Sequence, residues 1–167
     1  AFVASAEALS TLDQLGLTDD VASIGIAQDQ VTVASVKQAL TDKKTVVSGT
    51  YDAPTYKDLV SQKCDLAIQD SALLTHVEKD KASGVATTDA VQPDADDATM
   101  SGADQVTRFN DMATRFATLN VPMLVDRSGD EADALAKAEW VKVYGAIYGC
   151  MDQADVLFDA AKAAEGK

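Results

Sequence analysis

The sequence predicts an α/β fold: a three-layer α/β/α lobe with a mostly parallel, five-stranded, Rossmann-like sheet. Short apolar runs alternate along the chain with longer segments whose apolar residues recur at helical spacing. Those longer segments are of the length that a crossover between parallel strands requires. The 167 residues also suit one domain with a substantial core.

The first part of the chain shows the alternation most clearly. The predicted strands of the whole chain are residues 1–4, 21–26, 45–48, 65–69 and 121–125. Ser5 follows the first strand and is a suitable N-cap for a helix that ends at Gly16. A short helical segment ends near Leu40, and Pro54 suits the first turn of the next helix.

Three further helices are predicted after residue 102. Asp104 is a plausible N-cap or first-turn acid for the first of them, whose apolar side chains recur on one face. The second spans residues 131–148 and ends at Gly149, and the third is capped by Asp152. The residues predicted to face inward on the helix at 131–148 are Leu135, Trp140, Val143, Tyr144 and Ile147.

Residues 72–102 interrupt this alternation. They are rich in Asp, Ala and Thr and show no clear period, which predicts a long surface insertion. The D-x-D-x-D-G spacing of a calcium-binding loop is absent from the sequence, so the acidic run is interpreted as solvated surface.

Charge and motifs exclude several classes of function. The net charge is −13, from 14 Lys and Arg against 27 Asp and Glu, which argues against nucleic acid as a partner. No apolar run reaches the length of a membrane-spanning helix. His76 is the single histidine, and no phosphate-binding or nucleophile-elbow motif occurs. We therefore expect neither an enzyme, nor a bound metal, nor an intrinsic cofactor.

Residues 49–68 carry a resemblance to a known family. The sequence has Gly, Tyr, Pro, two apolar residues and then Asp-Leu-x-Ile at a characteristic spacing: Gly49, Tyr51, Pro54, Leu59, Val60, Asp65, Leu66 and Ile68. This pattern resembles the first lobe of the substrate-binding proteins of ABC importers for ferric siderophores, haem and cobalamin. The chain departs from it where Lys57 or Asp58 stands near the usual Glu, and where Cys64 replaces the usual Pro.

A second match lies downstream in the same order. The run L-N-V-P-M-L-V-D at residues 119–126 is followed by an amphipathic helix at 137–149, similar to a strand, loop and helix of that first lobe. The resemblance implies an N-terminal lobe at residues 1–149, the start of the interlobe connector helix at 150–167, and a second lobe absent from this chain.

The resemblance also implies a function and partners. It predicts an extracytoplasmic protein, periplasmic or held at the cell surface as a lipoprotein. Such a protein closes two lobes on a ferric siderophore, haem or cobalamin and presents the ligand to ABC permease subunits. Membrane association would come only from a lipid anchor or from the permease. The alternatives are a non-transport α/β interaction or sensory module and an enzyme on a similar scaffold.

Ligand contacts in such a lobe are expected from the loops at the carboxyl ends of the strands. In chain order these candidates are Glu7, Gln28, Tyr51, Asp70, Ser71 and Arg127. Tyr51 suits stacking on a flat ligand, and Arg127 suits bidentate contact with ligand oxygens. For both residues a purely structural role, as a packed ring or an exposed surface charge, is the alternative.

Two further predictions concern docking and the cysteines. By the resemblance, an acidic residue on the rim meets permease arginines, and Glu78 or Asp104 is the candidate. Cys64 and Cys150 lack metal-site spacing. In an oxidising compartment they can form a disulfide, and the alternative is two separate buried thiols.

Overall fold

The sheet of the protein is parallel throughout. The computed structural model describes residues 1–74 and 102–165. Its strands are β1 (Phe2–Val3), β2 (Ser23–Ile24), β3 (Val46–Val47), β4 (Ala67–Asp70) and β5 (Met123–Asp126). They lie in the order β3-β2-β1-β4-β5, and every neighbouring pair is parallel. The predicted α/β fold with a five-stranded parallel sheet is confirmed, although each strand is shorter than its apolar run.

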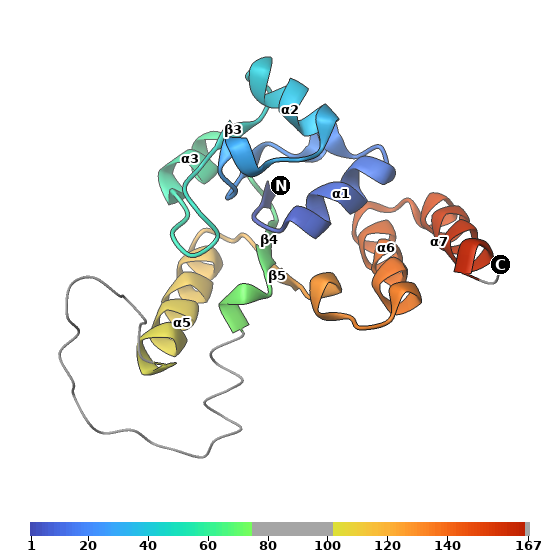
Figure 1. Ribbon diagram of the computed structural model, residues 1–167. Helices are drawn as coiled ribbons and strands as arrows, with labels where there is room; N and C mark the ends of the chain where they lie inside the picture. The colour runs from blue at the N-terminus through green and yellow to red at the C-terminus, as the bar shows by residue number, and fades with distance from the viewer. Residues whose placement is uncertain (75–101, 166–167) are drawn as a thin grey trace.

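Helices cover both faces of this sheet. They are α1 (Ala6–Gln14), α2 (Ala34–Thr41), α3 (Tyr56–Ser61), α5 (Gly102–Thr118), α6 (Ala134–Tyr148) and α7 (Met151–Glu165). Short 3-10 turns are η1 (Thr18–Asp20), η2 (Gln28–Gln30) and η3 (Ser128–Asp130). Figure 1 shows α3 and α5 on one side of the sheet, α1 and α6 on the other, and α7 beyond α6.

Two hydrophobic cores correspond to the two faces. One joins Val3 and Ile68 of the sheet to Leu9 of α1, Val36 of α2 and Tyr144 of α6. The other joins Phe2 and Ala67 to Leu59 of α3 and to Met112 and Phe116 of α5. Successive strand residues point to opposite faces, so the Phe2-Val3 and Ala67-Ile68 pairs each supply both cores.

Several helices begin or end at the capping residues that the sequence predicted. Ser5 is the N-cap of α1, because its Oγ accepts a hydrogen bond from the Ala8 amide at 3.1 Å. Gly149 ends α6 in the left-handed region at φ 71°. The helix predicted at 131–148 begins later, at Ala134, because Asp133 caps it and η3 occupies the residues before.

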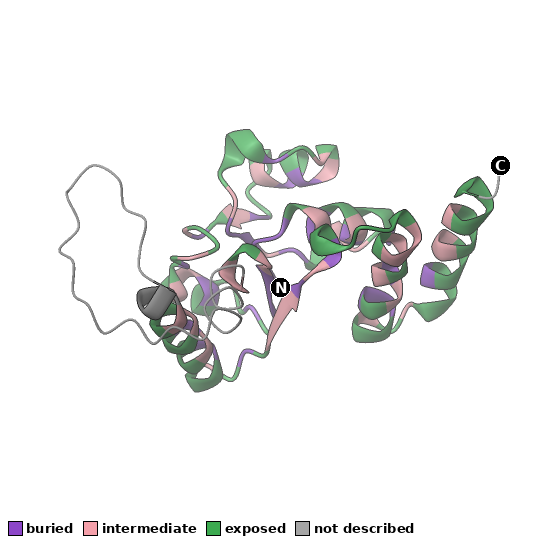
Figure 2. Ribbon diagram, turned by 60° about the horizontal axis from the view of Figure 1, so that its bottom comes forward, coloured by how far each residue is buried: buried purple, intermediate pink, exposed green. Residues whose placement is uncertain are grey.

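The predicted inward face of α6 is wrong in part. Val141 and Tyr144 are buried, but Val143 and Ile147 remain 37% and 45% exposed. Helix α7 packs against α6 at Gly145, where Ala154 of α7 is buried. Most of α7 is exposed, as the green surface of that helix in Figure 2 shows. Contacts with two neighbours, the sheet and α7, therefore determine which residues of α6 are buried.

Candidate ligand-binding site at the carboxyl edge of the sheet

The direction in which successive strands are added to the sheet reverses between β1 and β4. The chain leaves β1 toward β2 on one side, whereas β4 is followed by β5 on the other side. The loops after β1 and β4 therefore diverge, and ligands of open α/β sheets bind at such a point, outside the carboxyl ends of the strands. The segments that meet here are Ser5–Glu7, Asp70–Ser71 and Asp126–Asp130, which we call the carboxyl-edge cluster.

Asp126 links the loops after β1 and β5. Its carboxylate is almost fully buried and accepts hydrogen bonds from Ser5 Oγ at 2.7 Å and from the Ser128 amide at 2.9 Å. Ser5 thus caps α1 and holds Asp126 with the same hydroxyl. Asp126 was not among the candidates predicted from the sequence, although an Asp directly after the predicted strand at residues 121–125 was a usable signal.

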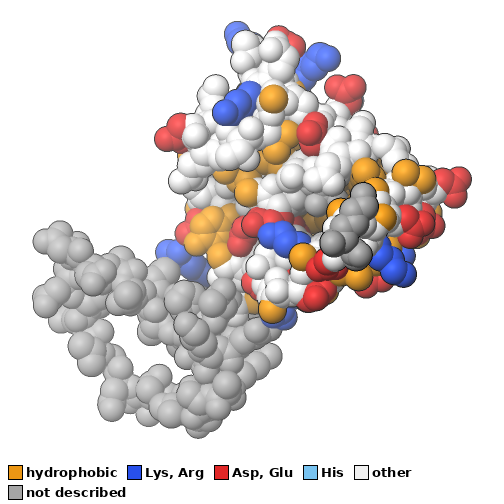
Figure 3. Space-filling model, turned by 45° about the vertical axis from the view of Figure 1, so that its right-hand side comes forward, with side chains coloured by type: hydrophobic (Ala, Val, Ile, Leu, Met, Phe, Trp, Pro, Cys, Tyr) orange, Lys and Arg blue, Asp and Glu red, His pale blue; other side chains and the backbone are white. Residues whose placement is uncertain are grey.

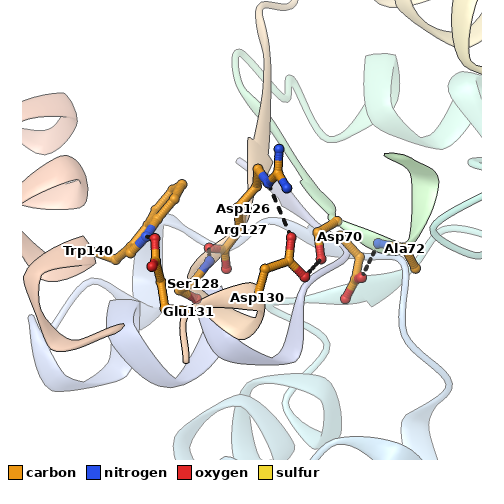
Figure 4. Close-up of polar contacts among 9 residues, drawn as sticks. Asp70, Ala72, Asp126, Arg127, Ser128, Asp130, Glu131 and Trp140 are labelled. Carbon is orange, nitrogen blue, oxygen red and sulfur yellow. Dashed lines mark hydrogen bonds and ion pairs between the residues drawn. The ribbon is translucent and has the colours of Figure 1, made fainter. Parts of the chain in front are cut away.

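Asp130 joins two residues that the sequence singled out. Its Oδ1 accepts a hydrogen bond from Ser71 Oγ at 2.9 Å, and its Oδ2 pairs with Arg127 Nε at 3.1 Å. Figure 4 shows the Asp130 carboxylate between Arg127 of the β5 loop and the β4 loop that carries Asp70. The predicted Ser71 and Arg127 are therefore brought together by a third residue that was missed.

Asp70 stands among other carboxylates. It lies opposite Asp126 in the β4–β5 register and accepts a hydrogen bond from the Ala72 amide at 2.8 Å. Partial burial raises the pKa of the Asp70 carboxyl, the Ala72 amide lowers it, and the charges of Glu7, Asp126 and Asp130 raise it further. The cluster therefore favours a ligand that brings hydrogen-bond donors or positive charge.

Tyr51 lies within electrostatic range of this cluster. Its pKa is raised, first by partial burial and then by the charges of Asp52 and Asp70, while Arg108 lowers it. Gly49 shapes the loop that carries Tyr51, at φ 82° and in a bridge with Pro54. A side chain at residue 49 would collide with the backbone of Ala53, so the loop requires glycine there.

The remaining candidates stand apart from the cluster. Gln28 is exposed on η2, between β2 and α2, whereas the cluster lies at the carboxyl ends of β1, β4 and β5. Asp104 lies in the first turn of α5, as predicted. Glu78 and His76 lie outside the described residues, as do residues 75–101 of the insertion predicted at 72–102.

The two cysteines are free thiols. Cys64 is buried with the α3 and α5 core, whereas Cys150 packs against the core on the opposite face of the sheet. Burial raises the pKa of the Cys64 thiol above its ordinary value. A disulfide needs Cα atoms within about 7 Å, so the structure favours two separate thiols over the disulfide.

Behind the carboxyl edge, the buried side chains of Gln69 and Ser48 have no hydrogen-bond partner among the described residues. Gln69 of β4 is 0% exposed, and both its amide oxygen and its amide nitrogen are unpaired. Ser48, just after β3, is also fully buried with an unpaired hydroxyl. Gln69 shares the face of Ala67, because residues two apart on a strand point the same way.

Two properties of the described residues bear on ligands and membranes. They contain no group of three or more His, Cys, Asp and Glu side chains arranged to hold a metal ion. In the same part of the chain, no helix has both the length and the apolarity to cross a bilayer.

Comparisons with protein-family models, with curated proteins and with solved structures gave no match.

Proposed function

We propose that this chain is the first lobe of an extracytoplasmic substrate-binding protein that delivers a metal chelate to an ABC importer. One observation carries the proposal. Four of the residues selected as ligand contacts, Glu7, Asp70, Ser71 and Arg127, belong to a single cluster at the carboxyl ends of β1, β4 and β5, where the strand order reverses. The sequence resemblance at residues 49–68 and 119–149 supports the same function.

Charge narrows the ligand class within this proposal. The cluster contains four carboxylates, on Glu7, Asp70, Asp126 and Asp130, and one guanidinium, that of Arg127, which already pairs with Asp130. Outside the cluster, Lys137 lies 4.0 Å from Glu7 and offsets part of this negative charge. An anionic catecholate chelate or the propionates of haem would add negative charge beside these groups. A neutral or cationic chelate with outward N–H or O–H groups matches the cluster better. We therefore favour a hydroxamate-type ferric chelate or cobalamin over the anionic ligands.

The direct test maps weak binding onto the chain. Gallium(III) replaces ferric iron as a diamagnetic ion, and backbone amide shifts are followed by NMR during titration with a neutral hydroxamate chelate. We expect saturable shifts at Glu7, Ser71 and Arg127, and smaller shifts with a gallium catecholate chelate. Cobalamin and haem are titrated in the same way.

A matched pair of variants separates ligand contact from general effects. Ser71→Ala removes a hydroxyl of the cluster, and Ser61→Ala removes an exposed hydroxyl at the end of α3. Ser71→Ala should weaken the shifts while Ser61→Ala leaves them unchanged. The proposal fails if no chelate shifts the edge amides at millimolar concentration, or if the shifts map to α7 instead.

A further inference from the structure

A hollow lies beside the carboxyl-edge cluster, between α1, α6 and α7. Its volume is about 470 Å³, within the usual range for small-molecule sites. It belongs to the sheet face that carries α1 and α6, away from α3 and α5. Of the residues that line it, Ala6, Glu7 and Ser128 also belong to the cluster, and the other ten do not. The hollow is therefore a separate place where a small molecule can sit.

Its two walls differ in chemistry. The α1 wall presents the hydroxyl of Ser10 and the amide of Gln14, whereas the opposite wall presents Val141 of α6 and Leu157 of α7. Figure 3 turns the α6–α7 side forward and shows charged and apolar side chains interspersed on it. An occupant of such a hollow needs one polar edge and one apolar body.

Opposite charges stand at the rim of the hollow. Lys137 Nζ and Glu7 Oε1 are 4.0 Å apart, at the limit of an ion pair, and both side chains are partly exposed. Exposed pairs of this kind contribute only about 0–1 kcal/mol. A ligand with an ammonium and a carboxylate can therefore engage both groups with little loss of protein stability.

Ser128 supplies an independent sign of a ligand. It lines the hollow and is 3% exposed, yet its Oγ has no hydrogen-bond partner in the described structure. A buried hydroxyl is normally paired, because leaving it unpaired costs about 1–3 kcal/mol. The backbone amide of Ser128 already donates to Asp126, so the residue is held in place.

From these observations we infer that the hollow binds a free α-amino acid with an aliphatic side chain. The ligand ammonium faces Glu7 and donates to Ser128 Oγ, and the ligand carboxylate meets Lys137. The aliphatic side chain lies against Val141 and Leu157, where its burial contributes to affinity. This inference stands independently of the transport function proposed above.

The test uses leucine and two analogues that each lack one charge. Titration with L-leucine should shift the amides of Ser10, Gln14 and Lys137 saturably in NMR spectra. 4-Methylpentanoate lacks the ammonium and 3-methylbutylamine lacks the carboxylate. Each should bind about tenfold or more weakly, the effect of one charge-assisted hydrogen bond. Equal binding of all three compounds, or no saturable shift with leucine, overturns the inference.

Variants assign the carboxylate contact to one side chain. Lys137→Met should weaken leucine binding about tenfold and leave the binding of 3-methylbutylamine unchanged, because that amine lacks the carboxylate. Lys162→Met makes the same change on the exposed end of α7, outside the hollow lining, and should leave leucine binding unchanged. Ala138→Leu fills the hollow and should abolish binding, with circular dichroism as the check that it folds. Leucine binding to Lys137→Met at wild-type strength overturns the inference.

Discussion

Two buried polar side chains near the carboxyl edge, Asp126 in the cluster and Gln69 just behind it, differ in their hydrogen bonding. In the cluster, the buried carboxylate of Asp126 receives two protein hydrogen bonds, from Ser5 and Ser128. Behind it, the buried amide of Gln69 receives and donates none. A paired buried group stabilises the fold and an unpaired one destabilises it. Removing the polar atoms of Asp126 should therefore destabilise the protein, and removing those of Gln69 should stabilise it.

The largest effect is expected at Asp126. Replacement by Ala leaves the Ser5 hydroxyl and the Ser128 amide without their acceptor in a buried place. We expect a loss of about 2–4 kcal/mol in the free energy of unfolding, measured by urea denaturation. Asp19→Ala, at a side chain that is 91% exposed, is the control and should change stability by less than about 0.5 kcal/mol. Equal losses of stability for the two substitutions would contradict the stabilising role of the hydrogen bonds that Asp126 accepts from Ser5 and Ser128.

A steric effect of intermediate size is expected where α6 meets α7. A Cβ at Gly145 would lie 2.5 Å from Ala154 Cβ, which is closer than two such atoms can approach. Gly145→Ala should therefore destabilise by about 1–3 kcal/mol, although glycine to alanine normally stabilises a helix interior. The double variant with Ala154→Gly should recover part of this loss. A gain in stability for Gly145→Ala alone would show that the two helices are not in contact there.

A smaller effect of the opposite sign is expected at Gln69. Gln69→Met keeps a similar volume and removes the two unpaired polar atoms. The free energy of unfolding should rise by about 1 kcal/mol. Gln62→Met, at an exposed position after α3, is the matched control and should have no such effect. Destabilisation by Gln69→Met would mean that the amide has a partner after all.

The smallest effect is a pH dependence from Asp70. The pKa of its carboxyl is raised in the folded protein, chiefly by burial, so the folded state holds the proton more strongly than the unfolded chain. This contribution favours folding at acidic pH and is lost as pH rises from the ordinary value of 3.8 through the raised value. As the pH rises to 7, the free energy of unfolding of Asp70→Asn should increase relative to that of the wild type. Urea denaturation of both proteins at each pH measures this difference. If the stability of the two proteins depended on pH in the same way, the raised pKa of Asp70 would be contradicted.

Local features of the fold could be predicted from the sequence, because they depend on neighbours in the chain. Ser5 as a cap and Gly149 as a helix end follow from backbone chemistry within a few residues. The alternation of strands and helices follows from hydrophobic periodicity in the same way.

Other features depend on residues far apart in the sequence. Ser5 and Asp126 are separated by 121 positions, and Ser71 and Asp130 by 59, so no local pattern reveals either pair. The inward face of α6 was mispredicted because Val143 and Ile147 fit the helical period equally well. Contact with α7 decides which of the apolar residues is buried.

The bond between Ser5 and Asp126 also bears on the order of folding. It joins residues 121 positions apart, and such long closures carry a large entropic penalty until intervening contacts have formed. The hydroxyl can reach the carboxylate only after β1 and β5 have both joined the sheet through β4. The carboxyl-edge cluster is therefore assembled late, and a chain that has folded only through β3 does not yet have it.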